Sequence, residues 1–211
     1  MKKEKITINN EEIKETKALI IECAGQLIAK YGYAKVTSKS ICEKSKVNMT
    51  AINYHFGSRD GLYMAVLKEV HKFLINVDEL NELYLSNLSA KEKLEAFIDI
   101  FVKSSYNEKS WHIKVWTREI VNPSPFINQI LSQEGLPKLN IVSKIFSEYT
   151  GLPITEPKLY SCILNTMAPF ILMFLAQDTA ELLPVKYSGK DLVAHLKKFV
   201  FAGLDEFKTK D

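Results

Sequence analysis

Apolar side chains recur along most of this chain at spacings of three and four residues, the period of a helix with one buried face. In the first such segment Ile20, Ala24 and Leu27 share a face, which predicts a helix from near Thr16 to Gly32. The same pattern, with its caps and breaks, predicts further helices over residues 37–44, 48–55, 59–73, 89–105, 109–121, 126–133, 139–149, 157–177 and 189–207. No segment alternates as a β-strand would. We therefore predict an all-α protein of about nine to ten helices, with three short N-terminal helices before a larger antiparallel bundle.

The composition agrees with a helical globular protein and excludes several other classes. Gly and Pro are sparse, at 8 and 7 of 211 residues, and a chain of this length buries roughly 70% of its unfolded surface without a covalent staple. The cysteines Cys23, Cys42 and Cys162 are odd in number and form no C-x-x-C pair, so we expect no disulfide scaffold, no metal and no cofactor. The longest apolar run, residues 167–176, is about half of a membrane span. Since residues 1–12 also lack the apolar core of a signal peptide, we expect a cytoplasmic protein that does not enter the membrane.

Positive charge is concentrated in the N-terminal third. Residues 1–71 hold 12 Lys or Arg against 8 Asp or Glu, whereas residues 72–211 hold 16 against 17. A basic cluster on a small domain is typical of phosphate binding, although a solvated helix face has the same composition. The charge distribution becomes informative only together with a motif.

That motif lies in residues 37–62, where two short predicted helices are separated by a tight turn. This is the layout of a helix-turn-helix, in which one helix crosses the DNA backbone and the next lies in the major groove. The pattern made by Ile52, Tyr54, His55, Phe56, Ser58, Arg59 and Leu62 resembles the TetR family of bacterial repressors. Residues 48–63, and Arg118-Glu119 followed by the Asn-Pro-Ser-Pro-Phe run at 122–126, are similar to the CecR-like branch of that family.

One departure from the family pattern affects the turn. The family usually has Ala-Gly-Val there, with the glycine in the left-handed conformation, whereas this chain has Ser45-Lys46-Val47. A lysine at positive φ costs roughly 1–2 kcal/mol, which packing must offset. Lys46 at this exposed corner could gain a phosphate contact in exchange.

The motif assigns DNA-contacting roles to two sets of side chains. Residues at the start of the second helix are expected to read base edges, because Asn can bind adenine while Met, Ala and the Thr methyl pack on thymine. The base-reading set is Asn48, Met49, Thr50, Ala51 and Asn53. The phosphate-binding set is Thr37, Ser38, Lys39, Lys46, Tyr54, His55 and Arg59. Two alternatives stay open: Tyr54 and His55 are packing residues of a small domain, and Asn48 is a helix cap.

The resemblance implies a division into a flexible arm at 1–12, a DNA-binding domain at 13–62 and a ligand-binding and dimerisation domain at 63–211. Large aromatic side chains with a few polar groups form the candidate effector pocket: Phe101, Tyr106, Trp111, Trp116, Arg118, Met167 and Phe170. Apolar positions on the last two long helices form the candidate dimer interface: Leu159, Ile163, Phe170, Phe174, Leu192, Leu196 and Phe199. Both sets also fit an ordinary helical core.

These observations predict a homodimeric repressor that binds double-stranded operator DNA at a palindrome and is released by an unidentified small-molecule effector. Two other classes of protein fit parts of the sequence. A non-catalytic helical adaptor would use the basic region on a protein or an anionic membrane surface. A small helical enzyme would need His112 or His195 beside Glu119 or Cys162, but the chain has no nucleophile elbow, no zinc-protease motif and no phosphate-binding glycine loop. We therefore expect no enzymatic activity.

Overall fold

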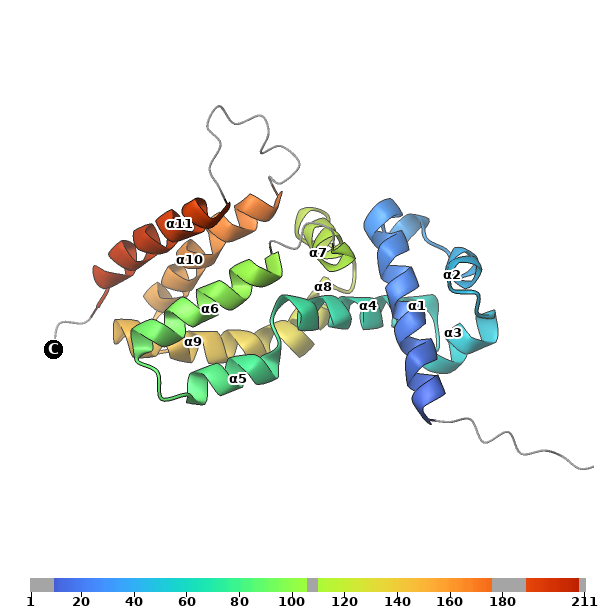
Figure 1. Ribbon diagram of the computed structural model, residues 1–211, viewed down its shortest axis with the longest axis horizontal. Coiled ribbons are helices and arrows are strands. Elements are labelled where there is room, and N and C mark those ends of the chain that lie inside the picture. Colours follow the sequence, from blue (N-terminus) through green and yellow to red (C-terminus); the bar gives the residue numbers. More distant parts are fainter. Residues whose placement is uncertain (1–9, 106–109, 176–188, 209–211) are drawn as a thin grey trace, which may run out of the picture.

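The structure, a computed structural model, describes residues 10–105, 110–175 and 189–208. All secondary structure in these ranges is helical, as predicted (Figure 1). The first three helices form one end of an elongated molecule, and α4 runs from them towards the remaining helices. Tyr106, a predicted pocket residue, lies outside the described ranges, and the side chain of Phe174 is likewise not described.

The N-terminal helices begin and end largely where the sequence predicts. They are α1 (Asn10–Tyr31), α2 (Ser38–Ser45), α3 (Met49–Phe56) and α4 (Arg59–Leu74), with a 3-10 turn at Tyr33–Lys35. The prediction that α1 starts near Thr16 is wrong, because the helix begins six residues earlier. Glu11 and Glu12 lie in its first turn, where negative charge complements the helix dipole. The Thr16 hydroxyl donates to the Glu12 carbonyl at 2.8 Å inside the helix instead of capping it.

The remaining helices differ from the prediction at two places. They are α5 (Val77–Leu85), α6 (Ala90–Ser105), α7 (Trp111–Val121), α8 (Ile127–Ile130), α9 (Leu136–Thr150), α10 (Pro157–Leu175) and α11 (Gly189–Asp205). The short α5 was not predicted. The predicted break between residues 133 and 139 is also wrong, because a π-helical turn at Leu131–Gly135 joins α8 to α9. Pro137 is tolerated there because it lies in the first turn of α9, where a missing N–H costs little.

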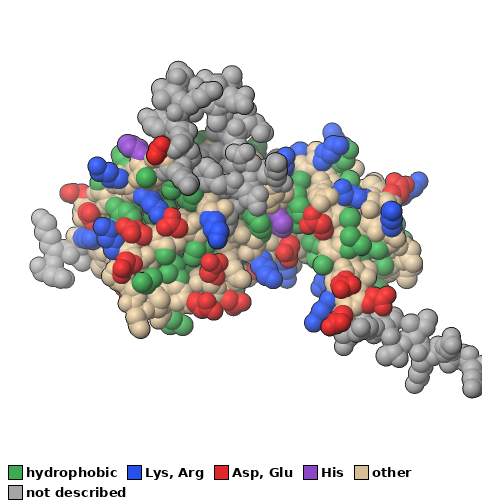
Figure 2. Space-filling model, in the orientation of Figure 1, with side chains coloured by type: hydrophobic (Ala, Val, Ile, Leu, Met, Phe, Trp, Pro, Cys, Tyr) green, Lys and Arg blue, Asp and Glu red, His purple; other side chains and the backbone are tan. Residues whose placement is uncertain are grey.

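Two hydrophobic clusters hold the molecule together. The first cluster contains residues of α1, α2, α3 and α4, together with Trp111, Ile113 and Val115 of α7 and Ile130 of α8. The second is built from α5, α6, α9, α10 and α11. Helix α7 therefore packs with the N-terminal helices, although it follows α6 in the chain. A recess lies below α4 in the view of Figure 2, between α1 and the rest of the molecule, and Lys or Arg side chains flank it on both sides.

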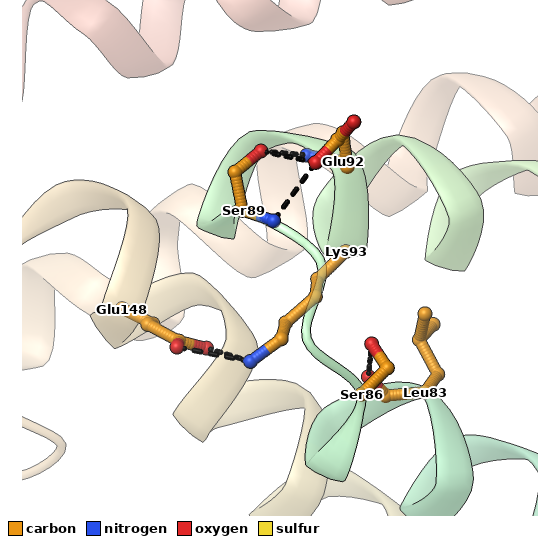
Figure 3. Close-up of polar contacts among 6 residues, drawn as sticks. All are labelled: Leu83, Ser86, Ser89, Glu92, Lys93 and Glu148. Carbon is orange, nitrogen blue, oxygen red and sulfur yellow. Dashed lines mark hydrogen bonds and ion pairs between the residues drawn. The ribbon is translucent and has the colours of Figure 1, made fainter.

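Polar contacts fix the start of α6 against α9. Ser89 and Glu92 form a capping box: the Ser89 hydroxyl accepts from the Glu92 N–H at 3.3 Å, and the Glu92 carboxylate accepts from the Ser89 N–H at 2.8 Å (Figure 3). The next residue, Lys93, is buried and donates to both carboxylate oxygens of Glu148 at 3.0 and 3.1 Å. A buried ammonium needs such a partner, so this pair fixes the register of α6 on α9.

Candidate nucleic-acid interface

The turn between α2 and α3 has the geometry that the sequence predicts. Lys46 is at φ 57° and ψ 24°, in the left-handed region, and is the one non-glycine residue at positive φ among the described residues. Ser45 before it is buried, and its hydroxyl donates to the Ile41 carbonyl at 2.7 Å. The chain thus places an exposed lysine at a corner that usually favours glycine.

Both short helices are capped by their own side chains. The Thr37 hydroxyl accepts from the Ser40 N–H at 3.2 Å, and the Asn48 Oδ1 accepts from the Ala51 N–H at 2.9 Å. The cap interpretation of Asn48 is therefore correct, and it leaves the Nδ2 group of that side chain as a donor. Because each cap is local, α2 and α3 start at fixed residues and present fixed faces.

Helix α3 presents a row of side chains to solvent. Ile52 is fully buried, whereas Met49, Thr50, Asn53 and Tyr54 are exposed, Tyr54 to 70%. That exposure argues against Tyr54 as a packing residue. His55 and Ala51 are half-buried at the side of the row. The exposed face of α3 has no partner in the described part of the chain and is free to meet a ligand as large as DNA.

The N-terminal part of α1 borders the same surface, which the sequence analysis did not predict. A cavity of about 550 Å³ lies between α1 and α3. Its lining residues are Glu12, Ile13, Thr16, Asn48, Thr50, Ala51, Tyr54 and His55. Nothing in the periodicity of α1 indicates this proximity, because it depends on how α1 and α3 cross.

Arg59 at the start of α4 is held in place by the connection between α1 and α2. Its guanidinium lies 4.4 Å from the centre of the Tyr33 ring and donates to the Val36 carbonyl at 3.2 Å. Asp60 is 3.9 Å away and accepts from the Tyr33 hydroxyl. The Arg59 side chain is half-buried and already held by these contacts in the absence of DNA. It therefore loses little conformational entropy when it binds an anion. The other predicted phosphate contacts, Thr37, Ser38 and Lys39, lie together at the N-terminus of α2.

The Arg118-Glu119 pair of α7 contacts these N-terminal helices. Arg118 donates to the carbonyls of Ala29 and Lys30, at 3.2 and 3.3 Å, and so caps the C-terminal end of α1. Glu119 is buried and accepts from the Tyr63 hydroxyl of α4.

Residues beyond α7 complete this contact. The Ser124 N–H and hydroxyl donate to the other oxygen of Glu119 at 3.2 and 2.9 Å. Burial, together with the Glu119 carboxylate, raises the pKa of Tyr63, so its hydroxyl stays protonated and remains a donor. Tyr63 stacks on Tyr33 at 4.1 Å between ring centroids. A continuous set of contacts therefore runs from Ser124 to Arg59.

The predicted effector-pocket residues do not lie in one place. The Trp111 indole donates to Glu22 at 2.8 Å and covers Gly25 of α1, where a Cβ atom would lie 2.4 Å from the ring. Trp116 lies edge-on to His71, with ring centroids 4.6 Å apart. In contrast, Phe101, Met167 and Phe170 belong to the second hydrophobic cluster. Arg118 is engaged by α1.

His71 is a buried polar residue that sequence reasoning missed. Its Nε2 atom has no hydrogen-bond partner, which is uncommon for a buried nitrogen. Burial, with the nearby Lys138 charge, lowers the pKa of His71 to about 4, so the ring is neutral at pH 7. The only sequence signal is a histidine on the apolar face of α4.

The predicted dimer residues differ widely in exposure. Leu159, Ile163 and Phe170 are buried within the chain, whereas Phe199 is 71% exposed. Leu192 and Leu196 are half-buried. Among the described residues of α10 and α11, the exposed large apolar side chains are Tyr160, Leu164, Leu172 and Phe199, and Phe207 follows just after α11. A cavity of about 290 Å³ lies between these helices, lined by Cys162, Asn165, Thr166, Phe199, Val200, Gly203, Leu204 and Phe207.

Two searches of the described residues bear on other kinds of site. They contain no group of three or more His, Cys, Asp or Glu side chains placed to hold a metal ion. No helix within them is long and apolar enough to span a bilayer.

Comparison with known proteins supports the interpretation of this surface. A family model described as bacterial regulatory proteins, tetR family, matches residues 20–66, and one described as the C-terminal domain of the HTH-type transcriptional dual regulator CecR matches residues 90–204. The HTH-type transcriptional regulator TtgR of Pseudomonas putida is 39% identical over 62 residues, which is 29% of this chain. That match spans 30% of the length of TtgR, and the probable regulator ArpR of Pseudomonas putida matches to the same extent.

Solved structures share the whole fold at low sequence identity. The fatty acid degradation regulator FadR from Bacillus halodurans has a TM-score of 0.67 at 16% identity, covering 90% of this chain and 96% of its own. SCO4454, a TetR-family regulator from Streptomyces coelicolor, has a TM-score of 0.68 at 12% identity, covering 93% and 97%. Proteins of this family are non-enzymatic transcription factors that bind operator DNA and dimerise. With the CecR model matching more than half of its length, this chain belongs to the TetR family of helix-turn-helix transcriptional regulators and carries a CecR-type C-terminal domain.

Proposed function

We propose that this regulator is a homodimeric repressor that binds a palindromic operator and is released by a small-molecule effector. The observation that carries the proposal is the exposed row on α3, with Met49, Thr50 and Asn53 beside the ordered Arg59. Side chains that face solvent at the start of a recognition helix reach base edges, and an anchored arginine next to them suits a flanking phosphate. Palindromic operators mirror the two-fold symmetry of the protein.

In this proposal the roles expected from the sequence are kept with one refinement. Asn48 has its Oδ1 atom engaged by the cap of α3, so it contributes to base reading mainly as an Nδ2 donor. Met49 and Ala51 supply apolar contacts to the bases, and Thr50 and Asn53 supply either apolar contacts or hydrogen bonds. The proposed phosphate contacts are Thr37, Ser38, Lys39, Lys46, Tyr54, His55 and Arg59.

The proposed dimer forms through the outer face of α10 and α11. Leu164, Leu172 and Phe199 each leave more than 60% of their side chains exposed, which costs free energy unless a second surface covers them. A two-fold interface would pair each face with its own copy and set the two α3 helices about 34–36 Å apart. Leu159, Ile163 and Phe170 then support this face from within the chain.

The proposed effector binds beside α7, near Trp116 and His71. The unpartnered Nε2 atom of His71 offers a hydrogen bond to a ligand, and a ring that stays neutral suits a ligand with an uncharged polar group there. Helix α7 also carries Arg118 and Glu119, which hold α1 and α4. An effector that moves α7 therefore changes the position of the DNA-binding helices, and operator binding and effector binding are reciprocally coupled.

The first experiment is selection of the purified protein against a random DNA pool at about 0.15 M salt. An enriched inverted repeat, with half-sites one helical turn apart or a multiple of it, supports a dimeric sequence-specific regulator. Repeating the selection with Met49→Ala should shift the preferred bases, at roughly 1–3 kcal/mol per lost base contact. Uniform, salt-sensitive binding without enrichment, or binding to anionic vesicles in place of DNA, contradicts the proposal.

A further inference from the structure

A second hollow lies on a different face of α1 from the one that borders α3. This groove has a volume of about 400 Å³, within the range of roughly 300–1,000 Å³ for small-molecule sites. It lies where α1 and α4 meet α5 and the π-helical turn before α9. Its lining residues are Lys17, Ile21, Ala65, Lys68, Glu69, Lys72, Asn76, Val77, Asp78, Glu134 and Lys138.

The most unusual residue of this groove is Lys138, which is only 8% exposed. Its ammonium donates to the His71 carbonyl near the end of α4, at 2.6 Å. An ammonium has three N–H donors, and that carbonyl accepts one of them. Among the described residues, no carboxylate lies within 4.0 Å of its nitrogen atom.

A comparison within the same molecule shows what Lys138 lacks. Lys93 is buried to a similar extent, at 6% exposure, and binds both oxygens of Glu148. Burying a charge without a counter-charge is costly. Burial lowers the pKa of the Lys138 ammonium, and Glu134 partly opposes this from beyond ion-pair distance. Capping the C-terminal end of α4 uses only one of the three N–H donors of Lys138. This capping role does not explain why a charged group lies in the groove.

Three further lysines line the same groove. Lys68 and Lys72 lie one turn apart on α4, and Lys17 reaches the groove from α1. All three are exposed. Three carboxylates also line the groove, but within the described residues none forms an ion pair with any of the four lysines. Ile21, Ala65 and Val77 supply an apolar part of the lining.

We propose that this groove binds a small organic carboxylate, with its negative group at Lys138 and its apolar body on Ile21 and Val77. Lys68 and Lys72 complete the positive surroundings of the carboxylate. Neither Trp116 nor His71 lines this groove, although Lys138 contacts the His71 carbonyl beside the proposed effector site. Because the lining comes from α1 and α4 on one side and from α5 and α9 on the other, a bound anion would link the two hydrophobic clusters.

The test is calorimetric titration of the full-length protein with octanoate, at pH 7 and constant ionic strength. Octanamide, which keeps the apolar body and loses the charge, is the matched ligand. We expect octanoate to saturate one site per chain and octanamide to bind at least about tenfold more weakly, the equivalent of one charge-assisted contact. Equal binding of the two ligands would show an apolar site elsewhere and overturn the proposal.

Variants locate the site. Lys138→Met keeps an unbranched side chain only one atom shorter and removes the ammonium, and it should abolish octanoate binding. Lys114→Met, on the exposed side of α7, removes the same charge at a distance and should leave binding unchanged. If Lys138→Met does not fold, the exposed pair Lys68→Met and Lys72→Met serves instead and should weaken binding at least about tenfold.

Two results would contradict the proposed carboxylate site. In the first, octanoate binds Lys138→Met, or the Lys68→Met/Lys72→Met variant, as tightly as the parent protein. In the second, octanoate does not bind the parent protein. If the Lys68→Met/Lys72→Met variant then loses operator affinity with a flatter salt dependence, the groove lysines are DNA phosphate contacts.

Discussion

At the scale of single residues, the proposed DNA-binding surface combines a side chain held in place before binding, that of Arg59, with a strained backbone position at Lys46. Arg59 is held between the Tyr33 ring and the Val36 carbonyl, and Lys46 occupies a backbone conformation that disfavours it. His71 is buried with an unpartnered nitrogen atom. Each feature has a measurable cost or benefit that a substitution can isolate.

Replacing Arg59 by alanine should weaken binding to all DNA sequences to a similar degree. The residue is placed for a phosphate, which carries no sequence information, so the slope of log K against log salt should fall by about 1. Fluorescence anisotropy over a salt series measures both effects. Arg59→Lys is the control, since it keeps the charge and loses the ordered guanidinium. A loss confined to one operator sequence would contradict the phosphate role.

Replacing Lys46 by glycine should stabilise the folded protein and weaken DNA binding at the same time. Relief of the left-handed strain, less the extra freedom of glycine in the unfolded chain, leaves a gain of about 0.5–1 kcal/mol. Urea unfolding measures the stability, and a salt series measures the DNA contact. Lys46→Ala removes the charge and retains the strain, so it should weaken DNA binding without the gain. A glycine variant that is less stable than the alanine variant by the usual entropic cost of glycine, about 0.4–1 kcal/mol, would show that the turn is not strained.

His71 should make the protein less stable as the pH falls. Its pKa is about 4 in the folded state against an ordinary value of 6.5, so the unfolded chain binds the proton first. The stabilisation is complete above pH 6.5 and is lost progressively down to about pH 4, by roughly 3 kcal/mol in total. Urea unfolding at pH 7 and pH 5 measures part of this loss. His71→Phe should show a smaller decrease over the same interval, and an identical decrease would rule out a contribution from His71.

At the scale of elements, α7 is the helix that ties the C-terminal part to the DNA-binding helices. Tyr63, Glu119 and Ser124 form a buried hydrogen-bond network between α4, α7 and the segment that follows it. Low dielectric surroundings strengthen such networks and make the loss of one member costly.

Removing the Tyr63 hydroxyl should therefore destabilise the protein by about 1–3 kcal/mol, since the buried Glu119 carboxylate loses a donor. Tyr149→Phe is a matched control, because Tyr149 also donates to a carboxylate, that of Asp205, which is exposed and can be rehydrated. Thermal and urea unfolding of both variants give the comparison. A cost for Tyr149→Phe as large as that for Tyr63→Phe would show that burial of the carboxylate is not the cause.

The sequence predicts elements well where the signal is local. The caps at Thr37, Asn48 and Ser89 follow from residues within one turn of each other, whereas the left-handed Lys46 follows from the resemblance to the family's Ala-Gly-Val turn. The start of α1 was missed because Thr16 looks like a cap but bonds inside the helix. The break near Pro137 was wrong because a proline in a first turn does not end a helix.

The candidate pocket was predicted less well because its partners are distant in sequence. Periodicity shows that Trp111 and Trp116 are on an apolar helix, but it does not show which helix they meet. The structure places Trp111 against α1 and Trp116 against α4, while Phe101 and Phe170 pack together in the other cluster. Residues chosen as one pocket thus divide between two clusters, and His71, between α4 and α7, has no sequence signal of its own.

At the scale of the whole molecule, the proposed function requires a second copy of the chain. The exposed apolar face of α10 and α11 is our proposed interface, and Phe199 is its most exposed large side chain among the described residues of those two helices.

Replacing Phe199 by glutamate should convert the dimer to a monomer at micromolar concentration, since a charge would be buried twice at a two-fold interface. Sedimentation equilibrium measures the mass. Operator binding should fall steeply, because a single α3 reads only half of a palindrome. Tyr54→Glu, equally exposed but on α3, should lose DNA binding and stay dimeric. A dimeric Phe199→Glu protein would place the interface elsewhere.

The packing of Trp111 on Gly25 also limits how such regulators can be recombined. The indole occupies the space that any Cβ at position 25 would need, with ring atoms 2.4 to 2.6 Å from it. An N-terminal part with a larger residue at this position cannot accept a C-terminal part that carries this tryptophan, unless α7 moves away from α1. Chimaeras that join the two parts of different family members should therefore transmit a signal only when this pair of positions is exchanged together.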